Sequence, residues 1–277
     1  YPFTFLKHKD IVAGGSLRFV MTDKPSSWGT SDNHIPVTEI KEHLIVAAPF
    51  IESGEIAFKG KTTIALNSVN KDATIYYSIG EEFKKYEDPI VIVDKVSLKM
   101  YAQKGDAKSA TITTEFFKID PNIRIELKTK YANQYNAGGD NALIDGIIGA
   151  QDFRTGTWQG YSDVDLHATV DLGKQKDISS IGLGFLEDQR SWIFLPTKVE
   201  MFISSDNKRF TKVATKVIDA TKPEENVSVK KVEFSFKNKK ARYIKVIAKK
   251  LGVLPTWHLG YKHDGRSWLF VDEIQIK

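Results

Sequence analysis

The chain has 277 residues with 41% hydrophobic and 27% charged residues, the composition of an ordinary globular protein large enough for two or three domains. Its longest apolar run, from about Leu44 to Ile51, is broken by Pro49 and is too short to span a bilayer. The absence of cysteine argues against an extracellular scaffold built on disulfides and leaves the compartment open.

The net charge of +5 raises the question of nucleic-acid binding. The basic residues, however, alternate with apolar ones, as in Arg242–Val246, which is typical of the solvated face of a sheet. We therefore expect no nucleic-acid partner. Residue 1 is a Tyr and no basic-then-apolar leader follows it, so we expect any secretion signal to be removed or to lie upstream in a longer parent chain.

Alternation of apolar and polar residues with a period of two recurs along the chain, whereas no segment keeps a period of 3.6 residues over three turns. Turn residues such as Gly14-Gly15 and Asp206-Asn207 separate these segments. Many short strands with frequent turns predict an all-β fold of consecutive β-sandwiches. In chain order, the clearest strand candidates are Leu17–Met21, Thr74–Ile79, Leu98–Ala102 and Val199–Ile203.

The chain divides into three blocks. Residues 1–47 are too few to bury a core of their own and are predicted to be the C-terminal tail of a larger upstream domain. Residues 48–119 hold about six strand candidates, enough for a small immunoglobulin-like sandwich, and residues 120–277 follow the Asp120-Pro121 boundary. Because no low-complexity linker separates the blocks, we expect them to pack closely.

The third block carries six short motifs in a characteristic order. The motifs are Asn141–Gly146, Thr157–Tyr161, Val170–Lys174, Ser204–Phe210, Ala241–Val246 and Asp272–Ile274. On these motifs the block resembles a coagulation factor type C (discoidin) domain, the group that includes carbohydrate-binding module family 32. This resemblance implies a galactose-binding-like jelly roll.

The second block resembles the immunoglobulin-like domain at the C-termini of bacterial chitobiases, on the residues of Ala73–Ile79, Lys85–Ile90 and Leu98–Ala102. The first block, with His8–Met21 and Trp28-Gly29, is similar to the closing β segment of glycoside hydrolase family 92. Those enzymes are calcium-dependent α-mannosidases typical of gut Bacteroidetes.

Together these resemblances imply the C-terminal region of a modular, exported glycosidase that is periplasmic, outer-membrane-associated or extracellular. Its catalytic carboxylates would lie upstream of Tyr1. We expect no catalytic residue in this chain, because Glu187-Asp188 and Asp272-Glu273 are adjacent pairs whose side chains point to opposite faces of a strand. A glycosidase needs two carboxyl groups that face each other.

Two aromatic-rich loops, residues 187–192 and 255–268, are suited to a glycan, because an aromatic ring stacks on a pyranose while planar charged groups bind its hydroxyls. We expect Trp158 and Trp268 to lie in the core. For Trp192, a core position and direct contact with a ligand are equally open. The candidate carbohydrate-binding residues are Trp257, His258, Arg190, Gln159, Tyr161 and Trp192.

The resemblance also implies a structural Ca²⁺ ion, and Asp145 and Glu273 are the candidate ligands, with backbone carbonyls completing the oxygen shell. The alternative is an Asx turn at Asp145-Gly146 and a solvent-facing Glu273. Ile147 and Ile148 depart from the polar turn that is usual in the family.

The leading functional hypothesis is a non-catalytic module that binds a glycan and so targets an upstream catalytic domain of the same chain. One alternative is a structural spacer, with no ligand of its own, in a β-N-acetylhexosaminidase or another glycosidase. Another is a surface adhesion module that binds membrane or protein through Leu251, Val253 and Leu254.

Overall fold

A computed structural model describes residues 1–36, 45–219 and 222–277. The chain divides into two compact units, Tyr1–Ile45 and Val46–Lys277, which we describe separately. Within the described ranges, no helix is long and apolar enough to cross a membrane.

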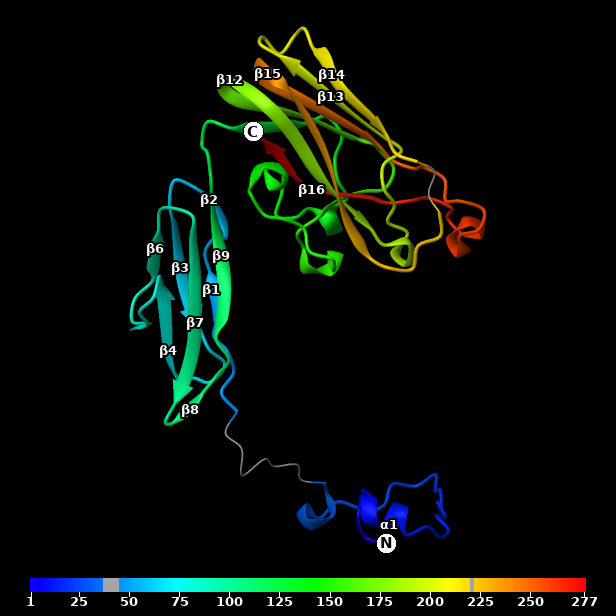
Figure 1. Ribbon diagram of the computed structural model, residues 1–277. Coiled ribbons are helices and arrows are strands. Elements are labelled where there is room, and N and C mark those ends of the chain that lie inside the picture. Colours follow the sequence, from blue (N-terminus) through cyan, green and yellow to red (C-terminus); the bar gives the residue numbers. More distant parts are fainter. Residues whose placement is uncertain (37–44, 220–221) are drawn as a thin grey trace. The chain divides into compact units, whose positions relative to one another are not determined.

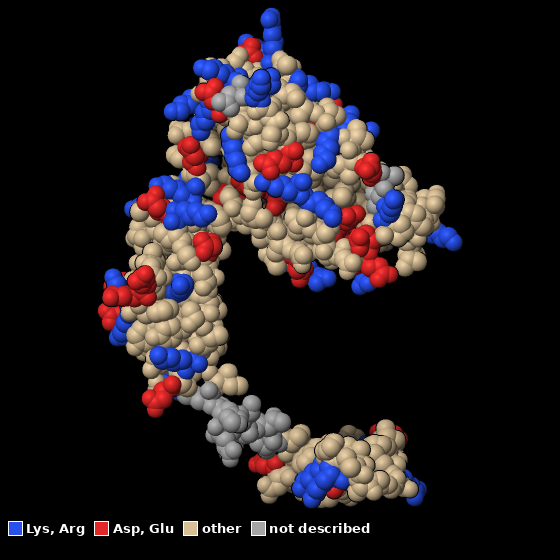
Figure 2. Space-filling model, viewed as in Figure 1, with Lys and Arg blue, Asp and Glu red and all other residues tan. Residues whose placement is uncertain are grey.

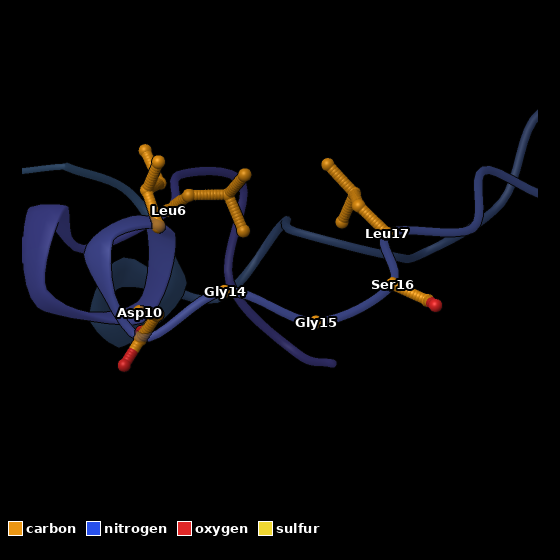
Figure 3. Close-up of a pocket in the computed structure, with 7 residues that line it drawn as sticks. Leu6, Asp10, Gly14, Gly15, Ser16 and Leu17 are labelled. Carbon is orange, nitrogen blue, oxygen red and sulfur yellow. The ribbon is translucent and has the colours of Figure 1, made fainter.

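The first unit has little regular structure: α1 (His8–Val12) and the short 3-10 helix η1 (Asp32–His34) (Figure 1). Thr4 N–H donates to the His34 carbonyl oxygen over 2.9 Å, and Trp28 Nε1 donates to the Tyr1 carbonyl oxygen over 2.8 Å. A shallow hollow of about 330 Å³ lies beside α1, with Leu6 and Leu17 on its apolar side (Figure 3).

The prediction of a strand at Leu17–Met21 is wrong. The segment is extended but belongs to no sheet of the described residues, and Leu17, Phe19 and Met21 are 59%, 75% and 87% exposed. Alternation shows which face of a strand would be buried, but a strand also needs a neighbour for its backbone hydrogen bonds. None of the described residues supplies that neighbour.

Residues 50–119 form two sheets around one core. Their strand orders are β1-β3-β6 and β2-β9-β7-β4-β5, with β2 parallel to β9 and β8 paired with β7 (Figure 1). Phe58, Ile64, Leu98 and Phe116, contributed by both sheets, are at most 1% exposed, so the sheets form a sandwich. The strands are β1 (Phe50–Ser53), β2 (Ala57–Lys59), β3 (Thr62–Asn67), β4 (Thr74–Ile79), β5 (Lys84–Lys85), β6 (Ile90–Ile92), β7 (Val96–Lys104), β8 (Ala107–Lys108) and β9 (Ile112–Ile119).

Residues 124–276 form a seven-stranded array in the order β11-β16-β12-β15-β13-β14, with β10 added to β12. Its loops contain the short 3-10 helices η2 (Asn133–Tyr135), η3 (Ala142–Ile144), η4 (Phe153–Thr155), η5 (Gln189–Ser191) and η6 (Leu259–Lys262). The strands are β10 (Arg124–Leu127), β11 (Gln159–Tyr161), β12 (Leu166–Glu187), β13 (Lys198–Ser204), β14 (Thr211–Val217), β15 (Ser228–Lys249) and β16 (Leu269–Ile276).

Two long strands, β12 and β15, run through both layers of this array. Residues 168–171 of β12 pair with β10, and residues 181–186 lie in the stretch that pairs with β16. The register between β12 and β15 shifts between Asp171 and Lys176. Buried residues of both halves, such as Val170 and Phe185, belong to one core. The prediction of an all-β fold of consecutive sandwiches is confirmed.

The loops at one end of this sandwich bond to one another. Phe194 N–H donates to the Trp268 carbonyl oxygen over 3.0 Å, Val253 pairs with Arg266, and Lys250 N–H donates to Asp165 Oδ1 over 2.9 Å. We call residues 162–165, 188–197 and 250–268 the rim. Basic and acidic side chains are interspersed over the visible face of the protein (Figure 2).

Candidate functional site

Gln189, which the sequence analysis did not single out, connects three segments at the rim. Its Nε2 donates to Glu187 Oε1 over 3.0 Å and to the Lys222 carbonyl oxygen over 2.9 Å, while its Oε1 accepts from Glu224 N–H over 2.9 Å. The side chain is 5% exposed. A buried Gln must find such partners, but no sequence pattern indicates that it will be buried.

His258 joins the two aromatic-rich loops. Its Nδ1 accepts from Gly260 N–H over 3.1 Å, so the ring proton is assigned to Nε2, which donates to the Gln189 carbonyl oxygen over 2.8 Å. Both ring nitrogens are therefore engaged within the protein. This geometry favours a positioning role for His258 over the predicted contact with a sugar hydroxyl.

Trp257 is the accessible aromatic residue that this arrangement holds at the rim. Its side chain is 42% exposed, and its ring lies 5.8 Å from the His258 ring at 68° and 6.4 Å from the Phe194 ring. Leu259 and Tyr261, which follow in the same loop, are also exposed. The loop thus presents apolar and aromatic surface on a fixed support.

Arg190 lies on the neighbouring loop and points into solvent. Its side chain is 74% exposed and reaches Glu225 at 3.9 Å, not Glu187 or Asp188, both of which are buried. Such an exposed pair contributes little to stability, so the guanidinium can rearrange around a ligand.

Trp192 is partly buried between the two loops, in the left-handed conformation with a φ of 65°. Its ring lies edge-on to His258 at 6.4 Å and packs against Gly260, where an added Cβ would lie 2.7 Å from Trp192 Cε2. A positive φ is unusual for a bulky residue and persists only where packing holds it. Trp192 therefore supports the loop of Trp257 and His258.

The prediction that Gln159 and Tyr161 project toward a ligand is wrong, because both are 0% exposed in β11. The Tyr161 hydroxyl donates to Gln159 Oε1 over 2.9 Å, and Gln159 Nε2 donates to the Gly139 carbonyl oxygen over 2.8 Å. The predicted core position of Trp158 is confirmed at 1% exposure. Trp268 packs edge-on against Tyr135 at 5.2 Å.

The candidate calcium ligands, Asp145 and Glu273, lie close enough to influence each other's charge. Burial raises the pKa of Asp145 to about 6 and that of Glu273 to about 8, and the Asp145 carboxylate adds to the shift at Glu273. Glu273 Oε2 and the neighbouring Asp272 Oδ1 are buried without a hydrogen-bond partner among the described residues. Unpartnered carboxylate oxygens with raised pKa values are groups that could serve as cation ligands.

Asp145 also forms the Asx turn considered as its alternative role, because its Oδ1 accepts from Ile147 N–H over 2.8 Å. Within the described ranges, no group of three or more His, Asp or Glu side chains has the arrangement to hold a metal ion. A cation at Asp145 and Glu273 would thus need backbone carbonyl oxygens as further ligands.

The domain is thus a two-layer β-sandwich whose loops are joined by hydrogen bonds at the rim. The family model of the F5/8 type C domain matches residues 126–274, more than half of the chain. The chain therefore belongs to the F5/8 type C domain family, as its motifs predicted. No curated protein matches the sequence.

Similar solved structures include two from Clostridium perfringens. One is CpGH89CBM32-5 in complex with GalNAc-β-1,3-galactose, at 19% identity and a TM-score of 0.36, covering 56% of this chain and 94% of that one. The other is the family 32 module of NanJ in complex with galactose, at 21% identity and a TM-score of 0.34, covering 56% and 93%.

A third similar structure is the C-terminal domain of a chitobiase from Bacteroides fragilis, at 15% identity and a TM-score of 0.35, covering 57% of this chain and 93% of that one. Because these scores and identities are low, the family assignment rests on the match of residues 126–274.

Proposed function

We propose that this chain is a non-catalytic carbohydrate-binding region that contacts glycan at the rim of its F5/8 type C domain. The observation that carries the proposal is the exposed Trp257 ring, which the His258–Gln189 hydrogen bond holds beside the loop of Arg190. Trp257 stacks on the apolar face of a sugar ring, and the guanidinium of Arg190 donates hydrogen bonds to its hydroxyls.

The expected affinity is modest. A single exposed ring and a few hydrogen bonds contribute about a kcal/mol each, which corresponds to dissociation constants of roughly micromolar to millimolar. Linkage to a catalytic domain in the same chain would raise the effective affinity for a polymeric or clustered glycan.

We further propose that the parent protein is an exported bacterial glycosidase, in keeping with the resemblance of the first block to family 92 α-mannosidases. The exposed, extended Leu17–Met21 segment supports this proposal, because its apolar side chains and backbone are available to complete a sheet of an upstream domain. The immunoglobulin-like block would then act as a spacer. The residues upstream of Tyr1 in the gene product test this parentage: a hexosaminidase barrel there would overturn it.

A structural Ca²⁺ ion at Asp145 and Glu273 is part of the proposal. When bound, it would offset the negative charge of two carboxyl groups whose ionisation is disfavoured by burial. Its role is to hold the η3 turn against β16, and it takes no part in sugar chemistry.

Calorimetric titration with mannose, galactose and N-acetylhexosamine panels tests sugar binding. We expect at least one ligand to bind the wild type, and the Trp257→Ala variant to bind it at least tenfold more weakly. If no member of the panels binds, the proposal fails and the spacer function is favoured.

Adhesion to a membrane is the second candidate, and the exposure of Val253 at 67% and Leu259 at 89% favours it. Sedimentation with phosphatidylserine-containing and neutral liposomes distinguishes it from sugar binding. Co-sedimentation that Leu259→Ala abolishes, without binding of any sugar, would support adhesion.

A further inference from the structure

A second concave surface lies at the rim, apart from Trp257 and Arg190. It is a cleft of about 650 Å³ between the start of β12, the end of β15 and the loops that flank them. Neither Trp257, His258 nor Arg190 lines it. Its polar lining residues include Thr129, Asp163, Asp165, His167, Lys250 and Arg266.

Lys250 is the unusual member of this lining. Its side chain belongs to a residue only 9% exposed, yet its ammonium group has no hydrogen bond or ion pair among the described residues. Burial lowers the pKa of Lys250, against the opposing effect of Asp163 and Asp165. The ammonium group is not among the fully buried side-chain atoms that lack a hydrogen-bond partner, so it remains accessible from the cleft that Lys250 lines.

The cleft wall next to Lys250 is firmly fixed. Thr129 Oγ1 donates to the Asp165 carbonyl oxygen over 2.7 Å and accepts from His167 N–H over 3.0 Å. Asp165 Oδ1 accepts from Lys250 N–H over 2.9 Å, and its Oδ2 has no partner among the described residues. An ammonium donor and a carboxylate acceptor thus belong to two residues that line the same cleft.

The charges of the lining are nearly balanced. Arg266 is paired with Asp163, which lowers the pKa of that carboxyl, and the charges of Asp163 and Asp165 both act on the Lys250 ammonium. Lys249 adds one positive charge at the exposed edge. An anionic ligand would meet Asp163 and Asp165 as well as the cations, whereas a neutral polyhydroxyl ligand can use donor and acceptor together.

We propose that this cleft is a second glycan-binding subsite, which takes a neutral saccharide through two adjacent hydroxyl groups. The Lys250 ammonium donates to one hydroxyl oxygen, and Asp165 Oδ2 accepts from the next. This subsite rests on the proposed carbohydrate-binding function and extends it: the chain binds an oligosaccharide, or two glycan branches, at two places on one rim.

The test compares Lys250→Met with Lys240→Met, a matched change at an exposed lysine on β15 that does not line the cleft. Calorimetric titration uses a neutral oligosaccharide that the wild type binds, with the corresponding uronic acid as the anionic probe. We expect Lys250→Met to weaken binding about tenfold, as loss of a charge-assisted hydrogen bond does, and Lys240→Met to leave it unchanged.

Thermal unfolding of the same variants separates a binding role from a structural one. Because methionine fills similar space without a partly desolvated charge, Lys250→Met should unfold at the same or a higher temperature than the wild type. A lower melting temperature, or unchanged affinity, would overturn the subsite.

The outcomes also separate this subsite from the proposed function. If Trp257→Ala loses binding while Lys250→Met binds normally, the proposed carbohydrate-binding function is supported and the second subsite is contradicted. Tighter binding of the uronic acid than of the neutral glycan, lost in Lys250→Met, contradicts the neutral ligand. A wild type that binds no glycan overturns both.

Discussion

His258 Nε2 donates to the carbonyl oxygen of Gln189 over 2.8 Å, across 69 positions of sequence. The contact joins the loop after β12 to the loop after β15, and the Gln189 side chain continues the connection to Lys222 and Glu224. The exposed residues of the rim, Trp257 and Arg190, each adjoin one partner of this contact. Their relative placement therefore depends on polar groups that are bonded within the protein.

Replacement of His258 by alanine should loosen this connection. Two hydrogen bonds are lost and the Gln189 carbonyl is left without this donor, so we expect the free energy of unfolding to fall by about 1–3 kcal/mol. Denaturant unfolding measures the loss. Glycan affinity should fall with it, and a variant that keeps wild-type stability and affinity would show that the contact has no positioning role.

Trp257→Ala should weaken glycan binding with little loss of stability, in contrast to the His258 variant. Because the side chain is 42% exposed, its removal should change stability by less than about 1 kcal/mol while glycan binding weakens. The matched control is Trp158→Ala, which empties a site only 1% exposed and should cost about 3–5 kcal/mol. Equal destabilisation by the two changes would place Trp257 in the core and contradict its binding role.

Gly260 permits close packing of the two loops, and Gly260→Ala should disturb it. A Cβ there would lie 2.7 Å from Trp192 Cε2 and 2.9 Å from Leu254 Cδ1, and Trp192 already holds a φ of 65°. We expect a loss of about 1–3 kcal/mol in thermal unfolding. Leu259→Ala, at a neighbouring residue 89% exposed, should stay within about 0.5 kcal/mol of the wild type.

Calcium should stabilise the protein more strongly as the pH rises. The pKa of Glu273 is raised from 4.5 to about 8 and that of Asp145 from 3.8 to about 6. The folded state thus keeps protons that the unfolded chain has released, and metal-free stability falls as the pH rises through this window. Calcium binds the ionised carboxylates, so its effect on the melting temperature should be larger at about pH 8 than at about pH 5.

Glu273→Gln should abolish both the calcium effect and much of this pH dependence, whereas Glu126→Gln, at an exposed position on β10, should preserve them. Melting temperatures in calcium and in chelator provide the measurement. Identical melting at about pH 8 in the two conditions would refute the calcium site.

Alternation in the sequence predicted strands well where a neighbouring strand exists. The predicted strand Thr74–Ile79 is β4, which pairs with β7 along its whole length. The predicted strand Val199–Ile203 lies within β13. Leu17–Met21 shows the same alternation but pairs with no strand among the described residues. Strand pairing requires a partner strand, which is often distant in sequence and is not encoded in the local pattern.

The candidate site was predictable only in part. Aromatic and charged residues in loops indicated the rim and Trp257, but the same reasoning included Gln159 and Tyr161, which β11 turns inward. A strand of three residues is too short to show a reliable periodicity. The roles of Gln189 and Lys250 arise from burial by distant loops, which no local pattern encodes.

The course of β12 and β15 through both layers affects how the domain can diversify. Each is 22 residues long and contributes to the common core on either side of the register shift, so neither layer can detach without breaking both strands. An insertion within them would displace residues in two sheets at once. New ligand preferences should therefore arise by exchange of rim segments on an unchanged sandwich, and chimeras that graft only those segments should fold.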